Sequence, residues 1–530
     1  MGATHEVTNQ PGPPEVHDPW GGDVALREAA AGAGADASVL ADYAAALARP
    51  ETRAAARAAA RHAPVLHRFD RAGRRIDSVE FHPGYHALLD LGLTQGYAAG
   101  PWTGGRHSTH AGMVYLQSTL EPATSCPMTM TYAAVPALCA DAGLEAAWRP
   151  RIVAAAYDPA DVQAEAKRGA TMGMAMTEKQ GGSDLRQTAT RAEPADGAWW
   201  LTGHKWFCSA PMSDAFLTLA QAPGGLTCFL VPRRRPDGRL NDIHLMRLKD
   251  KLGNRANASA EIEYHGALAW RLGDEGRGIA TILDMVHHTR LDTAVAPAGI
   301  MRAALAEAWH WAAHRTAFQR RLIDQPLMAR VLADLALDLE GAVALAFRVA
   351  RAFDGADEAD RAFARLAVAL AKYLNNKLCP RVVAEAMEVL GGMGYVEDTA
   401  LPMLYREAPL NGIWEGSGNV ICLDVLRTLA RVPLAGEVLR AELSAGRGIS
   451  APYDAALAAH QDRWRRLPDE AEARAFAEDT ALLLAAAALA RTAPPAVAEA
   501  FAATRLSPRR VGVGTVDLDP APLLARLAPG

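Results

Sequence analysis

The chain has 530 residues, half of them hydrophobic, and a formal net charge of -5 with 22% charged residues. That length predicts several domains, because single hydrophobic cores stop growing at about 250 residues. The slight acidic excess argues against a protein that binds nucleic acid through an overall basic surface. The six cysteines are scattered without a C-x-x-C pair, so the sequence gives little support to a zinc site or a disulfide framework.

The coarse pattern of elements changes three times along the chain. Residues 1–20 are polar and proline-rich and predict an extended arm, and residues 21–170 carry apolar side chains at helical spacing. Residues 171–276 contain short β-type runs between turns; in SAEIEYHG, Ala260, Ile262 and Tyr264 alternate with two glutamates, as in a half-buried strand. Long amphipathic helices return at 277–430 and predict a bundle, and residues 431–530 form an Ala- and Arg-rich helical extension.

This order predicts an α+β fold that is mostly α, with a helical domain, a β domain, a helical bundle and an extra helical domain. Strands and helices do not alternate, so a doubly wound nucleotide-binding fold is not expected. The glycine fingerprints of Rossmann and P-loop proteins are also missing from the sequence. The sequence has no apolar signal region and no uncharged run of about 18 apolar residues, which makes the cytoplasm the expected compartment.

Two segments carry the residues from which chemistry can be inferred. In NGIWEGSGNVICLDVLR (411–427), Glu415 lies between Trp414 and a Gly-Ser-Gly step that opens a helix. Small residues let the backbone approach a ligand, helix N-termini favour anions, and a carboxylate beside an indole is a candidate general base. An exposed glutamate in a glycine-rich turn between helices is the alternative. The second segment is MAMTEKQGGSDLRQTATR (174–191), which matches no catalytic triad, metal cluster or P-loop.

Together these segments resemble the acyl-CoA dehydrogenase family. MTEKQGGSD is similar to the T-E-x-x-x-G-S-D flavin segment of that family, and EAMEVLGGMGY (385–395) and IWEGSGN are similar to its C-terminal signatures. The chain resembles most the AidB subfamily, flavoproteins of the adaptive response to alkylation. THEVTNQP (4–11), CPMTMTYAA (126–134), LKDKLGNRANAS (248–259) and LYREAPLNGIWEGSGN (404–419) carry that likeness.

The resemblance implies noncovalently bound FAD, a helical–β-barrel–four-helix-bundle fold and a homotetramer. It places 174–183 along the isoalloxazine ring and pyrophosphate, and Phe207, Cys208 and Ser209 against the ring, although Trp206 and Phe207 could also be barrel core. The residues it assigns to FAD are Met174, Ala175, Met176, Thr177, Glu178, Lys179, Gln180, Gly181, Gly182, Ser183, Phe207, Cys208, Ser209, Arg315, Phe318, Gly391, Gly392, Ile413, Trp414, Gly416, Ser417, Gly418, Asn419 and Leu423.

Arg315 and Phe318 belong to RTAFQRRLIDQP, which resembles the family segment that reaches FAD across a subunit boundary. Gln319 replaces the usual glycine and Gln325 stands one place early, which puts those contacts in doubt, and Arg315 could be a plain surface arginine. His287 and His288 lack a carboxylate or cysteine at ligand spacing, so we expect no metal site there.

The family's reaction is α,β-dehydrogenation of an acyl-CoA thioester. By resemblance, Glu415 removes the α-proton, the β-hydrogen leaves as hydride to the flavin, and the backbone amide of Glu415 helps to polarise the thioester oxygen. Such an oxyanion contact is worth roughly 3–4 kcal/mol. Arg427, two to three turns beyond Glu415, matches a subfamily arginine at the mouth of the pocket; it could also be an ordinary arginine near a helix C-terminus.

Two functions remain open. The subfamily resemblance implies a flavoprotein of the alkylation response that binds double-stranded DNA and has weak, isovaleryl-type dehydrogenase activity. An ordinary metabolic acyl-CoA dehydrogenase that does not bind DNA is the alternative. The region 431–530 holds twelve arginines, no lysine and twelve Asp plus Glu, so any DNA surface requires arginines gathered on one side. The candidates, which could equally be solvated side chains, are Arg463, Arg465, Arg466, Arg505, Arg509 and Arg510.

Overall fold

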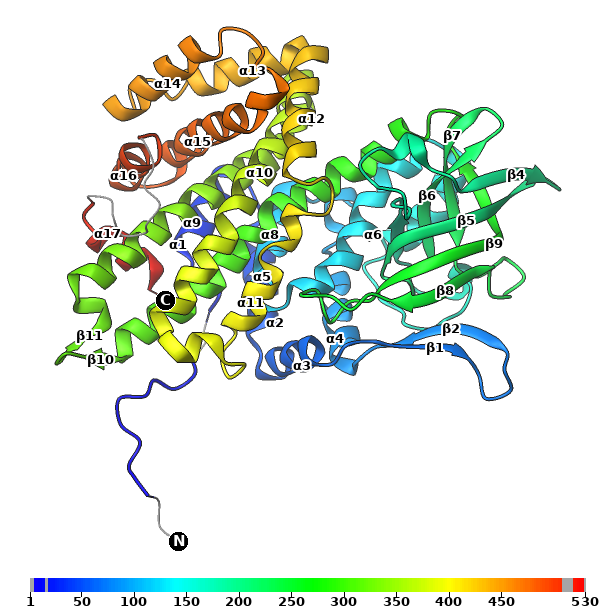
Figure 1. The fold of residues 1–530 in the computed structure, drawn as a ribbon, viewed down its shortest axis with the longest axis horizontal. Coiled ribbons are helices and arrows are strands. Elements are labelled where there is room, and N and C mark those ends of the chain that lie inside the picture. The colour runs from blue at the N-terminus through cyan, green and yellow to red at the C-terminus, as the bar shows by residue number, and fades with distance from the viewer. Residues whose placement is uncertain (1–3, 15–17, 508–517, 529–530) are drawn as a thin grey trace. The chain divides into compact units, whose positions relative to one another are not determined.

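The computed structural model describes residues 4–14, 18–507 and 518–528 (Figure 1). By its internal contacts the chain divides into two units. Unit 1 comprises Met1–Ala48, His107–Thr119 and Thr293–Gly530, and unit 2 comprises Arg49–Arg106 and Leu120–Asp292. Helix α8 (Gly278–His314) runs from unit 2 into unit 1. Among the described residues, no helix is both long and apolar enough to cross a membrane.

Unit 2 combines helices with nine strands of the described chain. Its α-helices besides the start of α8 are α3 (Pro50–Arg61), α4 (Pro83–Thr94), α6 (Ser125–Leu138) and α7 (Ala142–Ile152). Its 3-10 turns are η1 (Gly100–Trp102), η2 (Pro122–Thr124), η3 (Ala164–Ala166) and η4 (Leu185–Gln187). Its strands are β1 (Val65–Phe69), β2 (Arg75–Glu80), β3 (Met172–Ala175), β4 (Arg191–Ala195), β5 (Ala198–Ser209), β6 (Ala215–Ala222), β7 (Gly225–Pro232), β8 (Ile243–Leu248) and β9 (Ser259–Leu272).

Five of these strands close into a barrel. Strand β6 pairs with β7, β7 with β9, β9 with β5, β5 with β4, and a single pair, Arg191 with Gln221, joins β4 back to β6. β3 and β8 extend it by pairing with β6 and β9. The expected alternation in β9 is confirmed, because Ala260, Ile262 and Tyr264 are buried. Figure 1 shows these strands in green with α6 next to them.

The antiparallel hairpin of β1 and β2 contradicts the expectation of a wholly helical region before residue 171. Val65 pairs with Glu80 and Phe69 with Arg75, and Gly73 turns the chain with φ +80°. The hairpin was overlooked because its strands have only five and six residues and most of their side chains are exposed or half-buried. Such strands lack the strict alternation that marks a half-buried strand.

Unit 1 is helical apart from one short hairpin. Its first elements are α1 (Val24–Ala33), α2 (Ala37–Ala48), α5 (His107–Leu120), β10 (Thr316–Ala317), β11 (Arg320–Arg321), η5 (Leu322–Asp324), α9 (Pro326–Phe353), α10 (Glu358–Leu390), η6 (Gly391–Tyr395), α11 (Leu401–Glu407), η7 (Leu410–Gly412) and α12 (Gly418–Arg431). The C-terminal elements are α13 (Pro433–Ser444), α14 (Ala451–Arg463), η8 (Glu470–Glu472), α15 (Ala473–Thr492), α16 (Pro495–Arg505) and α17 (Ala521–Leu527).

The long helices of unit 1 form its core. Figure 1 shows α9, α10 and α12 side by side, with α15 packed on α9 and α10. Buried Asn375 on α10 donates its side-chain amide to Ala294 O of α8 at 2.8 Å and to Ala342 O of α9 at 3.1 Å. These bonds join three helices, because a buried amide donor needs an acceptor.

Ion pairs attach the C-terminal helices to this core. Arg505 lies 2.7 Å from both Asp334 and Asp338 of α9, and all three side chains are buried. Arg526 of α17 bonds Glu340 of α9 and Glu28 of α1 at 2.5 and 2.6 Å. Some arginines of the extension are therefore paired with acids inside unit 1 and are not on its surface.

Candidate functional site

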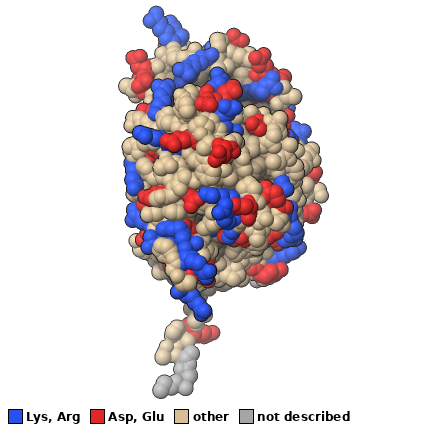
Figure 2. Space-filling model, turned by 90° about the vertical axis from the view of Figure 1, so that its right-hand side faces the viewer, with Lys and Arg blue, Asp and Glu red and all other residues tan. Residues whose placement is uncertain are grey.

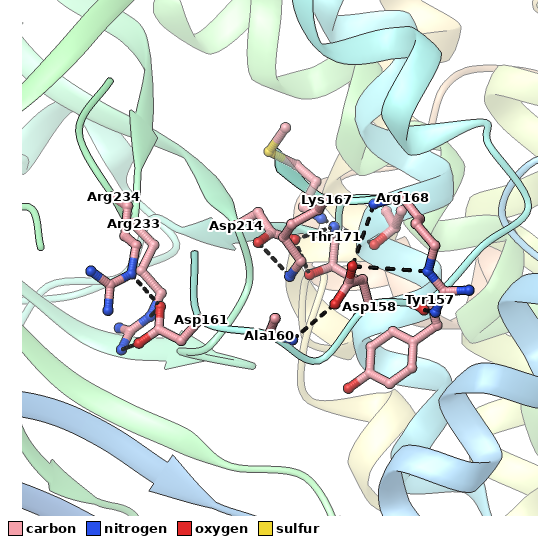
Figure 3. Close-up of polar contacts among 12 residues, drawn as sticks. Tyr157, Asp158, Ala160, Asp161, Lys167, Arg168, Thr171, Asp214, Arg233 and Arg234 are labelled. Carbon is pink, nitrogen blue, oxygen red and sulfur yellow. Dashed lines mark hydrogen bonds and ion pairs between the residues drawn. The ribbon is translucent and has the colours of Figure 1, made fainter. Parts of the chain in front are cut away.

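In unit 2, a cluster of ion pairs holds the chain where it enters β3, just before the segment 174–183 (Figure 3). Lys167 Nζ lies 2.7 Å from Asp214 Oδ1, and the backbone N–H of Thr171 donates to Asp214 Oδ2 at 2.8 Å. Asp161 pairs with Arg233 at 3.1 Å. Burial raises the pKa of Asp214 and Lys167 partly offsets that rise. The chain that leads into the segment is thus fixed by Asp214, directly before β6, and by Arg233, directly after β7.

The next contact is a buried ion pair within the segment itself. Glu178 Oε1 accepts from Lys205 Nζ at 2.7 Å and from the Thr190 hydroxyl at 2.6 Å, while Oε2 accepts from the backbone N–H of Ala189 at 2.7 Å. Lys205 also donates to Leu219 O at 2.8 Å. The Glu178 carboxylate therefore joins its loop to residues 189–190 and to the inside of the barrel.

The pair changes the acidity of both side chains. Burial by itself raises the pKa of Glu178, but the Lys205 ammonium and the hydrogen-bond donors outweigh it and lower the pKa to about 2. Burial lowers the pKa of Lys205 to about 8, although Glu178 opposes the change. Both groups are therefore charged at neutral pH. Glu178, predicted as a flavin contact, has its carboxylate turned into the barrel and acts as a support for the loop.

Two aromatic side chains, Trp206 and Phe207, lie beside this loop because β5 has a bulge there. The pairing with β9 shifts between Lys205 and Cys208, and the backbone N–H of Trp206 donates to Thr177 O at 2.7 Å instead of to β9. Phe207 is 46% exposed, whereas Cys208 is fully buried. Lys249 Nζ lies 3.3 Å from the centre of the Trp206 ring. Bulges of this kind redirect side chains next to active sites.

These residues fit a flavin. Gly182 lies so close to Thr177 that an added Cβ would come within 2.4 Å of its hydroxyl oxygen, and Gly181 has φ +153°. The loop therefore presents backbone groups and the Thr177 hydroxyl next to the part of β5 that carries the exposed Phe207 ring. The remaining predicted residues of this unit lie along it: Met174 and Ala175 in β3, Met176, Lys179, Gln180 and Ser183 in the following loop, and Ser209 at the end of β5.

In unit 1, a buried lysine organises the loop that carries Glu415. Lys372 of α10, 1% exposed, donates from Nζ to Asn411 O at 2.9 Å and to Gly416 O at 2.8 Å. Trp414 Nε1 donates to Asn411 Oδ1 at 2.7 Å. Glu415 has φ +56°, in the left-handed region. For a residue other than glycine this conformation costs about 1–3 kcal/mol, and it persists only where the surrounding structure imposes it.

Helix α12 begins directly after this loop. Ser417 is its N-cap but makes no side-chain capping bond, and Arg474 of α15 donates to Asn419 Oδ1 at 2.7 Å. Ile413 is 64% exposed and Leu423 is half-buried. Arg427 is exposed and lies 3.6 Å from Asp424.

The remaining predicted flavin contacts of unit 1 lie at the ends of long helices. Arg315, at the end of α8, donates to Asn9 O and, at 3.0 Å, to Gln10 Oε1 of the N-terminal arm. Phe318, at the tip of the β10–β11 hairpin, is 93% exposed. Gly391 and Gly392 follow α10, and a Cβ added at either would meet no atom within 4 Å.

The predicted phosphate-contacting arginines have different surroundings. Arg463 pairs with Asp479 at 3.3 Å and Arg465 pairs with Asp462, while Arg466 is exposed. The prediction for Arg505 is wrong, because this side chain is buried between two aspartates and cannot reach a phosphate. Arg509 and Arg510 lie outside the described residues. No group of three metal-ligating side chains occurs in the described part of the chain.

The sequence interpretation overlooked Lys205 and Lys372. Each is a single cation in an apolar run, HKWF and VALAKYL, and that mismatch was the available signal. A lysine that is buried without any partner would be very costly, so its place in such a run indicates acceptors nearby in space.

Replacing Glu178 by glutamine should destabilise the protein by about 3–5 kcal/mol, since the Lys205 ammonium would stay buried without its counter-ion. The measurement is the free energy of unfolding in denaturant, with exposed Glu193→Gln on β4 as control. The folded pKa of Glu178 lies below its ordinary value of 4.5, so its contribution is complete above pH 4.5 and fades as the pH falls toward 2. Equal stability of the two variants at pH 7 would contradict this role.

Three family models match consecutive parts of the chain. They are the adaptive response protein AidB N-terminal domain at residues 9–159, the acyl-CoA dehydrogenase middle domain at 173–267 and the acyl-CoA dehydrogenase C-terminal domain at 276–430. The putative acyl-CoA dehydrogenase AidB of Escherichia coli K12 is 43% identical over 516 residues, which cover 96% of this chain and 95% of the relative.

Solved structures agree with this assignment. The apo form of Bd2924 is 30% identical with a TM-score of 0.83, covering 92% of this chain and all of that one. Caenorhabditis elegans ACDH-11 in complex with C11-CoA is 27% identical with a TM-score of 0.85, covering 96% and 95%. The predicted fold class, FAD cofactor and enzyme class are therefore confirmed. The chain belongs to the acyl-CoA dehydrogenase family, with an AidB-type N-terminal domain, and is an FAD-dependent oxidoreductase of that family.

Proposed function

We propose that this protein removes hydrogen from the α and β carbons of an acyl-CoA thioester, with Glu415 as the base. The observation that carries the proposal is the placement of Glu415 in a left-handed conformation on a loop held by a buried lysine. Backbone strain of this kind is concentrated at active sites. The likeness to a relative crystallised with C11-CoA supports an acyl-CoA substrate, and a short branched isovaleryl-type chain with slow turnover is our specific expectation.

Each residue has a defined task in this proposal. The Glu415 carboxylate accepts the α-proton, and its backbone N–H donates to the thioester oxygen as negative charge develops there. Bound FAD would supply the hydride acceptor for the β-hydrogen. Thr177 and the small residues of 181–183 hold the flavin through hydroxyl and backbone groups, and Phe207 packs on its ring.

The FAD contacts of unit 1 are the second part of the proposal. The FAD contacts that we propose within unit 1 are Ile413, Trp414, the Gly416–Asn419 step and Leu423, with room for the adenosine half at Gly391 and Gly392 and Arg427 as the residue at the pocket mouth. Arg315 and Phe318 serve the FAD of a neighbouring subunit in a homotetramer. Phe318, which is 93% exposed, is accessible to such a neighbour.

Glu415→Gln should abolish flavin reduction while FAD stays bound, because the amide is nearly isosteric but cannot take the α-proton. Loss of a general base typically lowers the rate by roughly 100- to 10,000-fold. The test is anaerobic bleaching of the flavin by a panel of acyl-CoAs, with exposed Glu437→Gln on α13 as control.

The FAD content of each preparation is measured first, from the spectrum of the heat-released supernatant. Wild-type protein expressed with ample flavin should release FAD without any covalent remainder. Flavin reduction at the wild-type rate in Glu415→Gln would reject Glu415 as the base. If none of the acyl-CoAs reduces the flavin of the wild-type protein, the proposed substrate class is rejected.

DNA binding in an alkylation response, in the cytoplasm, is a second candidate function. It is favoured by the 43% identity to Escherichia coli AidB and by the exposed Arg463, Arg465 and Arg466 at the end of α14. Against it, the face drawn in Figure 2 has basic and acidic side chains interspersed, as expected of a chain with net charge -5. An ordinary metabolic dehydrogenase without DNA binding remains the alternative to this second function.

If the second function holds, duplex DNA should bind weakly, without sequence preference and with steep salt dependence. Log affinity should fall with log salt at about -0.9 per phosphate neutralised. Arg465→Glu with Arg466→Glu should weaken binding to all sequences and flatten that slope, while Arg57→Glu with Arg71→Glu, the same charge change at exposed positions of unit 2, should not. Gel retardation measures both, and a wild type that retards no DNA at low salt would leave only the metabolic function.

A further inference from the structure

Lys372 spans the two ends of the loop that presents Glu415. Its ammonium donates to Asn411 O, before the loop, and to Gly416 O, directly after Glu415, at 2.9 and 2.8 Å. The residues between these carbonyls include Trp414, whose indole N–H returns to the Asn411 side chain at 2.7 Å. Both ends of the loop are thus bonded to the same ammonium, and Glu415 lies between them, directly before Gly416.

The position of the ammonium is set by the core of unit 1. Lys372 lies in the middle of the 33-residue helix α10 and is 1% exposed. One turn further along α10, Asn376 donates to Lys372 O and to Thr293 O of α8, at 2.8 and 2.9 Å. The lysine stem therefore starts from backbone that is itself tied to a second helix.

Loop and lysine depend on each other. An ammonium has three donors and no acceptor, and inside a protein it requires acceptors in place of water. If residues 411–416 moved away, two of those donors would lose their acceptors inside the protein. This requirement ties the loop to α10 and offsets the unfavourable φ of +56° at Glu415.

We propose that Lys372 is a positioning residue for the dehydrogenation, which holds the carboxylate and the backbone N–H of Glu415 in their working orientation through Asn411 O and Gly416 O. The inference rests on the proposed role of Glu415 as the base. Lys372 touches neither the substrate nor the flavin in this role; it acts through the loop. Misplacement of a reacting group by about 1 Å can lower a rate by roughly 100-fold, which sets the scale of the effect.

The experiment compares Lys372→Met with Asn375→Leu in the full-length holoprotein. Met keeps length and apolar bulk but removes the ammonium. Asn375 is also buried on α10, but its side-chain amide bonds α8 and α9 and not the loop, so Asn375→Leu is a matched structural control. Lys372→Arg keeps a cation with several donors and is the conservative variant.

The first readout is hydrogen–deuterium exchange of peptides that cover residues 411–417. We expect faster exchange there in Lys372→Met, wild-type exchange in Asn375→Leu and partial recovery in Lys372→Arg. The second readout is anaerobic flavin reduction by an acyl-CoA that bleaches the wild type. We expect a rate constant about 100-fold lower in Lys372→Met, with KM and FAD content near wild type, and a much smaller change in Asn375→Leu.

Wild-type exchange and wild-type flavin reduction in Lys372→Met would overturn the inference. So would equal losses in Asn375→Leu, or a failure of both Lys372 variants to fold where Asn375→Leu folds, since either result would make Lys372 a general support of the bundle. Hydrogen exchange needs no turnover. A wild type that no acyl-CoA bleaches, with a loop that still depends on Lys372, would reject the proposed function and leave the bracing of the loop by Lys372 standing.

Discussion

A buried ammonium has to find acceptors, and in each unit of this chain a segment with an inferred functional role supplies such acceptors, in unit 2 together with strand β6. Lys205 is matched by Glu178 and by Leu219 O, and Lys372 by Asn411 O and Gly416 O. Breaking a buried ion pair typically costs about 3–5 kcal/mol, a large part of the roughly 5–15 kcal/mol that stabilises a whole domain. That cost applies to the segment with Glu178, which is held by a buried ion pair. The loop with Glu415 is held by two hydrogen bonds from a buried ammonium to backbone carbonyls.

The architecture was predictable where one element carries its own pattern. The burial of Ala260, Ile262 and Tyr264 follows from alternation along a single strand, and the long helices of unit 1 follow from apolar stripes over many turns. The β1–β2 hairpin was not predictable in this way, since its short strands are mostly exposed or half-buried and present no apolar face.

From motif and resemblance the candidate site was predictable only as a set of proposed ligand contacts, without the side chains that support them. The partners of the two lysines are distant in sequence: Glu178 lies 27 residues before Lys205, and Asn411 and Gly416 lie 39 and 44 residues after Lys372. A sequence shows a cation in an apolar run but not which carbonyl it meets. The same limit explains the error at Arg505, which was grouped with Arg509 and Arg510 as a candidate for phosphate contact, whereas its side chain pairs with the buried Asp334 and Asp338 of α9.

Charge composition is a poor guide to surface chemistry in such a chain. Twelve arginines against twelve acids in residues 431–530 permit either an open basic patch or internal pairing. Arg505 and Arg526 pair with acids of α9, and Arg491 joins Arg348 on Glu442. Arginine suits this use because its planar guanidinium meets two acceptors at once and stays charged when buried. Such pairs bind the extension to the bundle and place acids against its arginines, and of the candidate arginines in and just after α14, Arg463 and Arg465 also have an acidic neighbour.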